Sequence, residues 1–221
     1  ILFSMIADGA LATVIDNLAI DNAVVAFGEQ APAYYAQSFV AVGNLETVTF
    51  LAASASGPDD TDFRVLITET NGGTGAGIHP TNVLFESATL TVPFDPTFPI
   101  NRLEFTQFDI NAGGLALSPG TTYTIVLDAF VAYDGIEGSA GSAQNRNYAD
   151  GHFFHYGGSV AVGDRTTHFV DVANWVDGRV DDDLAFRLVF SIPAPTTLAL
   201  FGLGLIGLGF ARRRRTSRRS E

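Results

Sequence analysis

The sequence predicts an all-β protein: an antiparallel β-sandwich ectodomain of jelly-roll-like type, followed by one C-terminal transmembrane helix. Alternating or β-branched runs recur along the chain, and no long stretch shows helical periodicity. Turn-forming clusters separate these runs in a chain that contains 23 Gly and 9 Pro. A charge-free apolar stretch near the end leads into a row of arginines.

The predicted strands follow one another with short turns between them. A chain of 221 residues suffices for one sandwich, and its 18 Phe can fill a sizeable core. We see no boundary that would divide the body of the chain into two domains. The expected strands cover residues 36–42, 45–52, 62–70, 82–92, 102–110, 121–132, 168–172 and 183–192.

One turn carries a more specific structural signal. Ser118-Pro119-Gly120 precedes a predicted strand, and Tyr123 lies near the start of that strand. This is the arrangement of a tyrosine corner, a feature typical of β-sandwiches. We therefore expect the Tyr123 hydroxyl to bond to the backbone of the turn.

The first twelve residues resemble the end of a secretory signal peptide. The apolar run 1–7 is followed by Ala10-Leu11-Ala12, which has the spacing of a signal-peptide cleavage site. On this interpretation residues 1–12 are a remnant of the signal and residues 13–192 form the ectodomain. The alternative is that these residues form an edge strand of the sandwich.

The charge is distributed unevenly along the chain. Residues 13–192 carry 22 acidic residues and 6 Arg, a net charge of −16, whereas the other 6 Arg cluster at residues 212–219. An acidic body cannot neutralise phosphates, so we exclude nucleic acid as a partner. The absence of Cys excludes disulfides and thiolate metal sites.

The segment 193–221 has the features of a membrane anchor. Residues 188–211 are free of charge, and residues 198–211 are strongly apolar. About 20 residues cross a bilayer core, and uncharged residues upstream can complete the span. Arg212, Arg213, Arg214 and Arg215 would then stop translocation and remain in the cytoplasm. A buried core helix is the alternative, but its four glycines would each cost about 1 kcal/mol in a soluble helix.

The order of these features resembles the PEP-CTERM sorting signal of exported bacterial proteins. Pro193-Ala194-Pro195 precedes the apolar span and the arginine cluster, with Ala194 where the family has Glu. The resemblance implies recognition and cleavage near this motif by an exosortase-like membrane protease. It also implies insertion of the helix in the inner membrane before processing. After processing the protein would stay at the cell surface or outside the cell, with exopolysaccharide as a further partner.

A second resemblance concerns the fold alone. Gln37-Ser38-Phe39, the Gly120-x-x-Tyr123 strand and the segment 183–187 together resemble β-sandwich ectodomains of exported bacterial proteins with sorting tails. Those ectodomains have mostly unassigned activities, so this likeness implies a fold and no function.

Two acidic clusters are candidate calcium sites. Oxygen-rich loops suit Ca²⁺, which takes six to eight oxygen ligands. Neither cluster fits the EF-hand pattern, and ordinary solvated turns are the alternative. The candidate ligands are Asp59, Asp60 and Asp62, or Asp181, Asp182 and Asp183.

An aromatic region suggests a possible glycan-binding platform. Trp175, Tyr148 and Tyr156 lie among amides and histidines, and sugar rings stack on aromatic faces. The alternative is that these rings fill the core.

Catalysis is not predicted, because the chain lacks the G-x-S-x-G, H-E-x-x-H and P-loop motifs. We therefore expect a structural or adhesive surface protein. A carbohydrate-binding module, with or without Ca²⁺, is the alternative, and a secreted hydrolase is a weaker one.

Overall fold

The fold is described from a computed structural model of the chain. The described residues are 11–19, 22–28, 33–56, 59–71, 79–95, 105–132, 136, 138–145, 148–157, 165–177 and 183–192.

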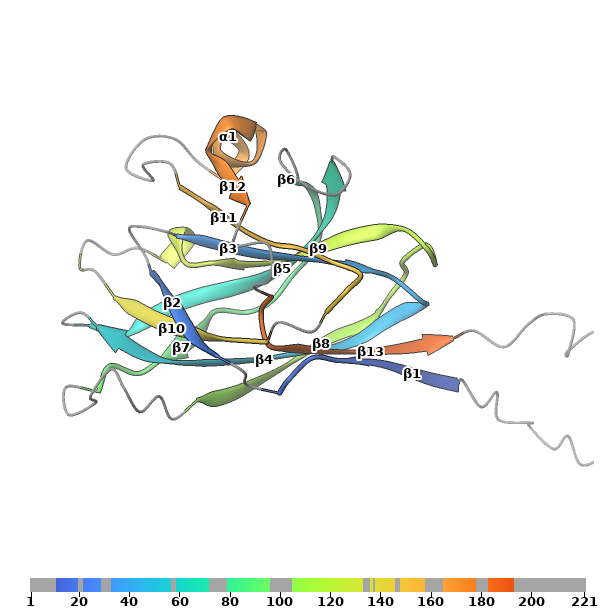
Figure 1. The fold of residues 1–221 in the computed structure, drawn as a ribbon, viewed down its shortest axis with the longest axis horizontal. Helices are drawn as coiled ribbons and strands as arrows, with labels where there is room; N and C mark the ends of the chain where they lie inside the picture. The colour runs from blue at the N-terminus through green and yellow to red at the C-terminus, as the bar shows by residue number, and fades with distance from the viewer. Residues whose placement is uncertain are drawn as a thin grey trace, which may run out of the picture.

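Two antiparallel sheets face each other and form a β-sandwich (Figure 1). In the first sheet the long strand β4 is central, because β8 pairs with one of its edges while β13 and β10 share the other. The order of this sheet is β1 (Leu11–Asp16), β13 (Phe186–Ile192), β4 (Asn44–Ser56), β10 (Ser139–Gln144) and β2 (Asn22–Gly28), with β8 (Thr106–Leu115) beside β4.

The second sheet lies above the first in the same view. Its order is β12 (Trp175–Asp177), β11 (Phe153–Tyr156), β3 (Tyr34–Val40), β9 (Thr122–Asp128), β5 (Thr61–Asn71) and β6 (His79–Glu86), with β7 (Leu90–Val92) paired to β5. The antiparallel sandwich predicted from the sequence is therefore present.

The main core fills the space between the two sheets. Successive side chains of a strand point to opposite faces, so Tyr35 and Phe39 of β3 enter this core. Phe63 lies near its centre, with its ring 5.6 Å from that of Phe27 and 5.5 Å from that of Phe50. Edge-to-face ring pairs of this kind add to the free energy that burial alone supplies.

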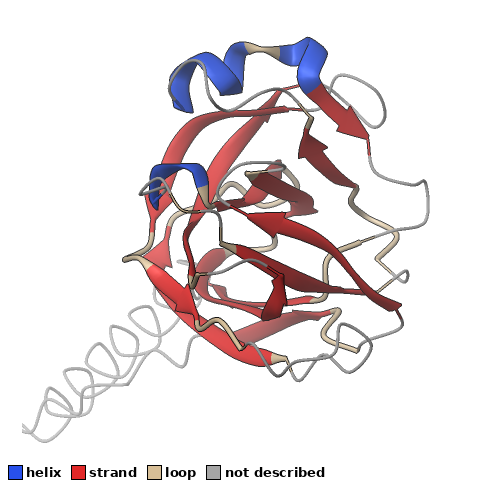
Figure 2. Ribbon diagram, turned by 90° about the vertical axis from the view of Figure 1, so that its left-hand side faces the viewer, coloured by secondary structure: helices blue, strands red, loops and turns tan. Residues whose placement is uncertain are grey.

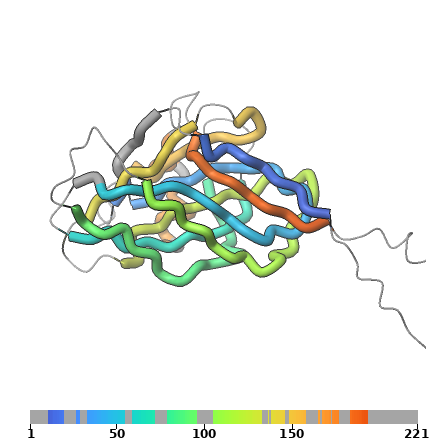
Figure 3. The backbone as a smooth tube through the Cα atoms, turned by 90° about the horizontal axis from the view of Figure 1, so that it is seen from below, coloured from blue at the N-terminus to red at the C-terminus, as the bar shows by residue number. Residues whose placement is uncertain are grey.

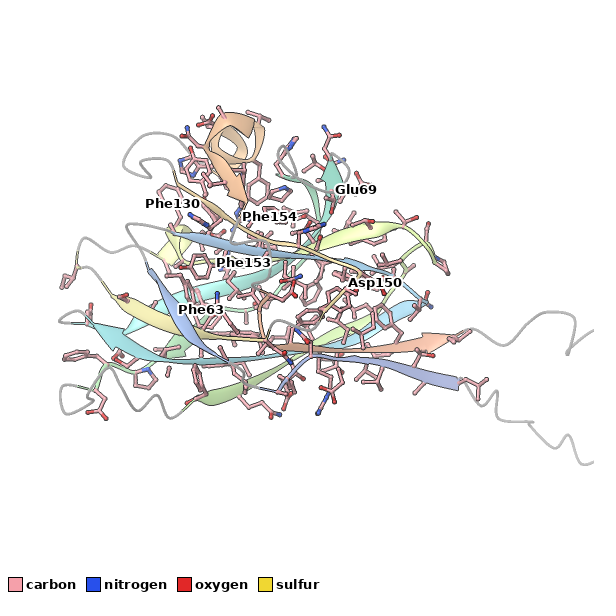
Figure 4. All side chains as sticks on the ribbon, in the orientation of Figure 1. Phe63, Glu69, Phe130, Asp150, Phe153 and Phe154 are labelled. Atoms are coloured by element: carbon pink, nitrogen blue, oxygen red, sulfur yellow. The ribbon has the colours of Figure 1, made fainter. Side chains whose placement is uncertain are left out.

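A second core covers the outer face of the second sheet. Neighbouring residues of β11 divide between the two cores, since Phe153 packs between the sheets and Phe154 packs outside them (Figure 4). The helix α1 (Arg165–Val170), the 3₁₀ turn η2 (Val172–Asn174) and β12 close this second core (Figure 2). Because both faces of this sheet are covered there, β3 and β9 are buried along nearly their whole length.

A buried polar network ties the second sheet to the chain that leads into β13. The Gln37 amide donates to Asp183 Oδ1 at 2.9 Å, and the Leu184 N–H donates back to Gln37 Oε1 at 2.9 Å. The Tyr148 N–H donates to the other carboxylate oxygen of Asp183 at 3.2 Å. Asn17 donates to the Leu184 carbonyl at 3.0 Å and so extends the network to the end of β1.

The predicted tyrosine corner is confirmed. The Ser118 N–H donates to the Tyr123 hydroxyl at 3.0 Å. The Thr121 N–H donates to the Ser118 carbonyl at 3.1 Å, and Gly120 has φ +79°. A positive φ at the third position, after a proline, is the geometry of a type II turn.

One expected strand is wrong, and one expected terminal segment overlaps a strand. Residues 168–172, expected as a strand, include the end of α1, because Arg165, His168 and Phe169 share one helix face that packs on the sheet. Leu11 and Ala12, expected to belong to a cleaved signal, lie in β1 and pair with Ile192 and Ser191. The structure thus places residues 11 and 12 in a strand at the edge of the sheet, whereas the signal remnant at residues 1–12 and the boundary after residue 12 stay predictions.

The expected transmembrane helix lies in residues 193–221, outside the described residues. Within the part of the chain that the structure describes, no helix has the length and apolar character needed to cross a membrane.

Replacing Tyr123 by Phe should lower the free energy of unfolding by about 1 kcal/mol, because the Ser118 N–H loses its acceptor in a half-buried turn. Urea unfolding followed by the fluorescence of the buried Trp175 measures this loss. Thr122→Val is the matched control, since it removes a hydroxyl from the exposed neighbouring position. Equal midpoints for the two variants would show that the corner contributes nothing.

Candidate functional site

The helix α1 is held firmly against the second sheet. The Trp175 indole N–H donates to the His168 carbonyl at 3.0 Å, and the Tyr34 hydroxyl bonds to His168 Nδ1 at 3.0 Å. The rings of Phe130 and Tyr156 lie 4.8 and 4.9 Å from the His168 ring. These contacts hold a six-residue helix that would not be stable alone.

An ion network links the first residue of α1 to two strands. Arg165 contacts Asp128 Oδ2 at 2.6 Å and Glu86 Oε2 at 3.0 Å. Glu86 also pairs with Arg64. The Asp128 side chain has no exposed surface, so Arg165 supplies the charge that this buried carboxylate requires.

The protonation of the two carboxyl groups reflects their different surroundings. Burial raises the pKa of Asp128, and the guanidinium of Arg165 opposes that rise. Hydrogen bonds from Arg165 lower the pKa of Glu86, and Arg64 adds to this effect. The network therefore contains two cations and two carboxylates and is close to neutral when all four groups are ionised.

A pocket of about 320 Å³ lies between β6 and α1. Figure 1 shows β6 rising beside the helix. Its walls combine apolar side chains with hydrogen-bonding groups. The described residues that line it are His79, Thr81, Asn82, Val83, Arg165, Phe169 and Val170. The pocket is therefore the candidate functional site of the described sandwich.

The aromatic residues predicted to bind glycans lie elsewhere. Trp175 is 4% exposed and Tyr156 is 3% exposed, and both rings pack in the second core. Burial, followed by the hydrogen bond to Asp171, raises the pKa of Tyr156 to about 12. Tyr148 lies apart from them, packs on Phe186 and accepts the Val40 N–H. These rings therefore have structural roles, and glycan binding through them stays a prediction.

The predicted calcium ligands are only partly described. Among the described residues, no group of three or more His, Asp or Glu side chains is arranged to hold a metal. Asp59 and Asp60 bond to nearby backbone N–H groups, and Asp62 bonds to the Thr91 hydroxyl. Asp183 belongs to the buried network with Gln37, whereas Asp181 and Asp182 lie outside the described residues.

The predicted sorting residues also lie outside the described residues, namely Pro193, Ala194, Pro195, Arg212, Arg213, Arg214 and Arg215. The structure does describe the point from which they continue. β13 ends at Ile192, paired with Leu11 at the outer end of β1, and Figure 3 shows the two strands side by side up to this end. The two ends of the described sandwich therefore lie together at one corner.

These observations define an antiparallel β-sandwich whose last strand leads directly into a C-terminal segment. Residues 191–215 match the PEP-CTERM protein-sorting motif. The resemblance inferred from the sequence is thereby confirmed, and the chain carries this motif. The motif indicates export, membrane-anchored sorting and processing by an exosortase, a membrane enzyme, before display at the cell surface.

No curated protein matches the chain. Among solved structures, it is similar to the clostridial cysteine protease Cwp84 after propeptide cleavage, with 11% identity and a TM-score of 0.45 over 82% of this chain and 40% of that one. It is also similar to a structure of the cysteine protease and lectin-like domains of Cwp84, a surface layer associated protein of Clostridium difficile. That match has 10% identity and a TM-score of 0.42 over 84% of this chain and 36% of that one. The chain thus spans less than half the length of each.

The pocket residues were not predicted from the sequence. Arg165 lies in a run with two threonines, and Glu86 and Asp128 lie at the ends of strands, where charged residues are common. Their importance appears only in the fold, where Arg165 contacts Glu86, 79 residues away in sequence, and Asp128, 37 residues away. The sequence did contain one signal. Arginines are few in the acidic body of the chain, so each of them is a candidate partner for a buried carboxylate.

Replacing Arg165 by Met should destabilise the fold by about 3 kcal/mol, because Asp128 would remain buried without its cation. Arg187→Met is the matched control. It breaks the exposed pair with Asp16, and its cost should stay below about 1 kcal/mol. Urea unfolding measures the free energy of unfolding of both variants. Adding Asp128→Asn to Arg165→Met should restore part of the lost stability, because the buried charge is then removed. Equal costs for the two arginines would contradict the proposed role of Arg165.

Proposed function

We propose that this chain is an exported surface protein that an exosortase-like protease processes near Pro193-Ala194-Pro195. Its β-sandwich ectodomain would have a structural or adhesive role in an exopolysaccharide matrix. The observation that carries the proposal is the sorting motif at residues 191–215, which begins within β13, the last strand of the described sandwich.

The placement of the chain ends supports the proposal. Leu11 and Ile192 pair at one corner, so both ends leave the sandwich at the same place. A helix inserted after residue 193 would hold this corner at the membrane and direct the rest of the sandwich away from it. The arginines from Arg212 onward would fix the orientation by remaining on the cytoplasmic side.

The composition of the ectodomain fits such a location. Its net charge of −16 favours solubility and discourages association between copies of the body. Stability without Cys depends on packing, and here two cores share the second sheet. A carbohydrate-binding role remains the alternative, with or without Ca²⁺, and a secreted hydrolase is a weaker one. The candidate calcium ligands are Asp59, Asp60 and Asp62, or Asp181, Asp182 and Asp183.

Replacing both Pro193 and Pro195 by Ala should reduce processing by about tenfold in a host that has an exosortase. The two prolines favour an extended backbone, which suits a protease cleft, and alanines would allow the helix to extend toward β13. The fraction of processed chain is measured from the shift in mass on immunoblots of membrane and surface fractions.

Ala194→Glu is the matched variant in the same motif. It restores Pro-Glu-Pro and should raise the processed fraction above that of the natural sequence. The proposal fails if the full-length chain is soluble in water without detergent, or if the double proline variant is processed as well as the natural chain.

A further inference from the structure

We propose that the pocket between β6 and α1 binds a neutral sugar. This inference does not depend on the sorting proposal, because it rests on the described residues of the sandwich alone. The glycan site would then lie between β6 and α1, beside the second core that contains Trp175 and Tyr156, and Phe169 belongs to both.

The size of the pocket limits the ligand. A volume of about 320 Å³ lies at the lower end of the roughly 300–1,000 Å³ that small-molecule sites occupy, which suits one or two sugar residues. An extended peptide needs a longer groove. Four residues of an extended peptide span about 13 Å. The helix α1, which forms one wall of the pocket, has six residues and is only about 9 Å long.

A sugar presents apolar C–H faces and polar hydroxyl groups, and the lining of the pocket has side chains that suit both. Val83 and Val170 are exposed and can contact the C–H face of a sugar ring, whereas Phe169 is 5% exposed and closes the pocket from the side of the second core. Asn82 gives one amide N–H to Glu69 Oε2 at 2.7 Å, and the amide has a second N–H and a carbonyl oxygen for hydroxyl groups. Thr81 adds a hydroxyl to the same wall. A purely apolar ligand would leave such groups without hydrogen bonds, at a cost in affinity.

The charges around the pocket favour a neutral ligand. Arg165 is the cation of the lining, and Asp128 and Glu86 already balance it. Glu69 accepts a hydrogen bond from the Asn82 amide, and its carboxylate gives the surroundings of the pocket a net negative charge. A uronic acid would therefore meet a neutralised arginine and a nearby carboxylate, so its carboxylate would lower its affinity.

Both walls of the pocket are tied to the second sheet. β6 is held by its pairing with β5, and α1 is held by the contacts of His168 and Arg165. The walls therefore need little ordering when a sugar binds, and this preorganisation favours binding by a small ligand.

The test uses the full-length chain in a detergent without a sugar headgroup. Titrations followed by saturation-transfer NMR compare the methyl glycosides of glucose, galactose, mannose and N-acetylglucosamine with glucuronic acid. We expect saturable binding of at least one neutral glycoside and weaker binding of the uronic acid. Val170→Arg, at a position that is 70% exposed, should fill the pocket mouth and weaken binding by about tenfold. Asn82→Ala should weaken it by about three- to tenfold.

Val176→Arg is the matched control, because Val176 is also an exposed valine but lies on β12, outside the lining. It should leave binding unchanged, and the melting temperatures of all variants establish that they are folded. The proposal is overturned if no neutral glycoside binds, if Val170→Arg and Val176→Arg bind equally well, or if the uronic acid binds more tightly than its neutral parent.

Discussion

The hydrogen-bonded pair of Gln37 and Asp183 is the constraint on which the arrangement of the sandwich depends. Gln37 points from β3 into a core of apolar side chains, where an unpaired amide would cost about 1–3 kcal/mol. Its two ends are satisfied by Asp183 and by the Leu184 N–H, and both belong to the segment that leads into β13. These hydrogen bonds therefore couple the position of the last strand of the first sheet to β3 of the second sheet.

The same segment connects the main core to the rest of the molecule. Asp183 holds the backbone at Tyr148, and Tyr148 precedes β11, whose residues alternate between the two cores. β11 in turn brings Phe154 and Tyr156 beneath α1, which forms one wall of the pocket. The position of the pocket thus follows from a continuous series of packed elements, and the ion network of Arg165 joins that series to β6.

The sequence predicted the features that are local and failed where distant residues decide. The tyrosine corner depends on six consecutive positions, and the strands 34–40, 44–56 and 61–71 carry strong β-branched or alternating patterns. β10 was missed because its small, polar residues 139–144 gain their strand conformation only from β2 and β4 on either side. The stretch at 168–172 was misassigned, since a short helix made of β-branched residues is stabilised by the sheet beneath it. The pocket was beyond prediction because its two walls lie about eighty residues apart in sequence.

The junction between β13 and the sorting motif has a mechanical consequence. Ser191 and Ile192 belong to both, and each pairs with β1 while Ser191 also pairs with Asn44 of β4. Pro193 follows Ile192 by a single residue, about 3.8 Å along the chain. A protease that cuts at the prolines must therefore approach the edge of the folded sandwich, or the last pairs of β1 and β13 must open first. Leu11, which closes that end of the ladder, is 73% exposed, so opening the final pair removes little burial. The pair of Leu11 and Ile192, in which Leu11 is largely exposed, thus lies where the sorting motif begins, whereas the polar network around Asp183 holds the chain at the other end of β13.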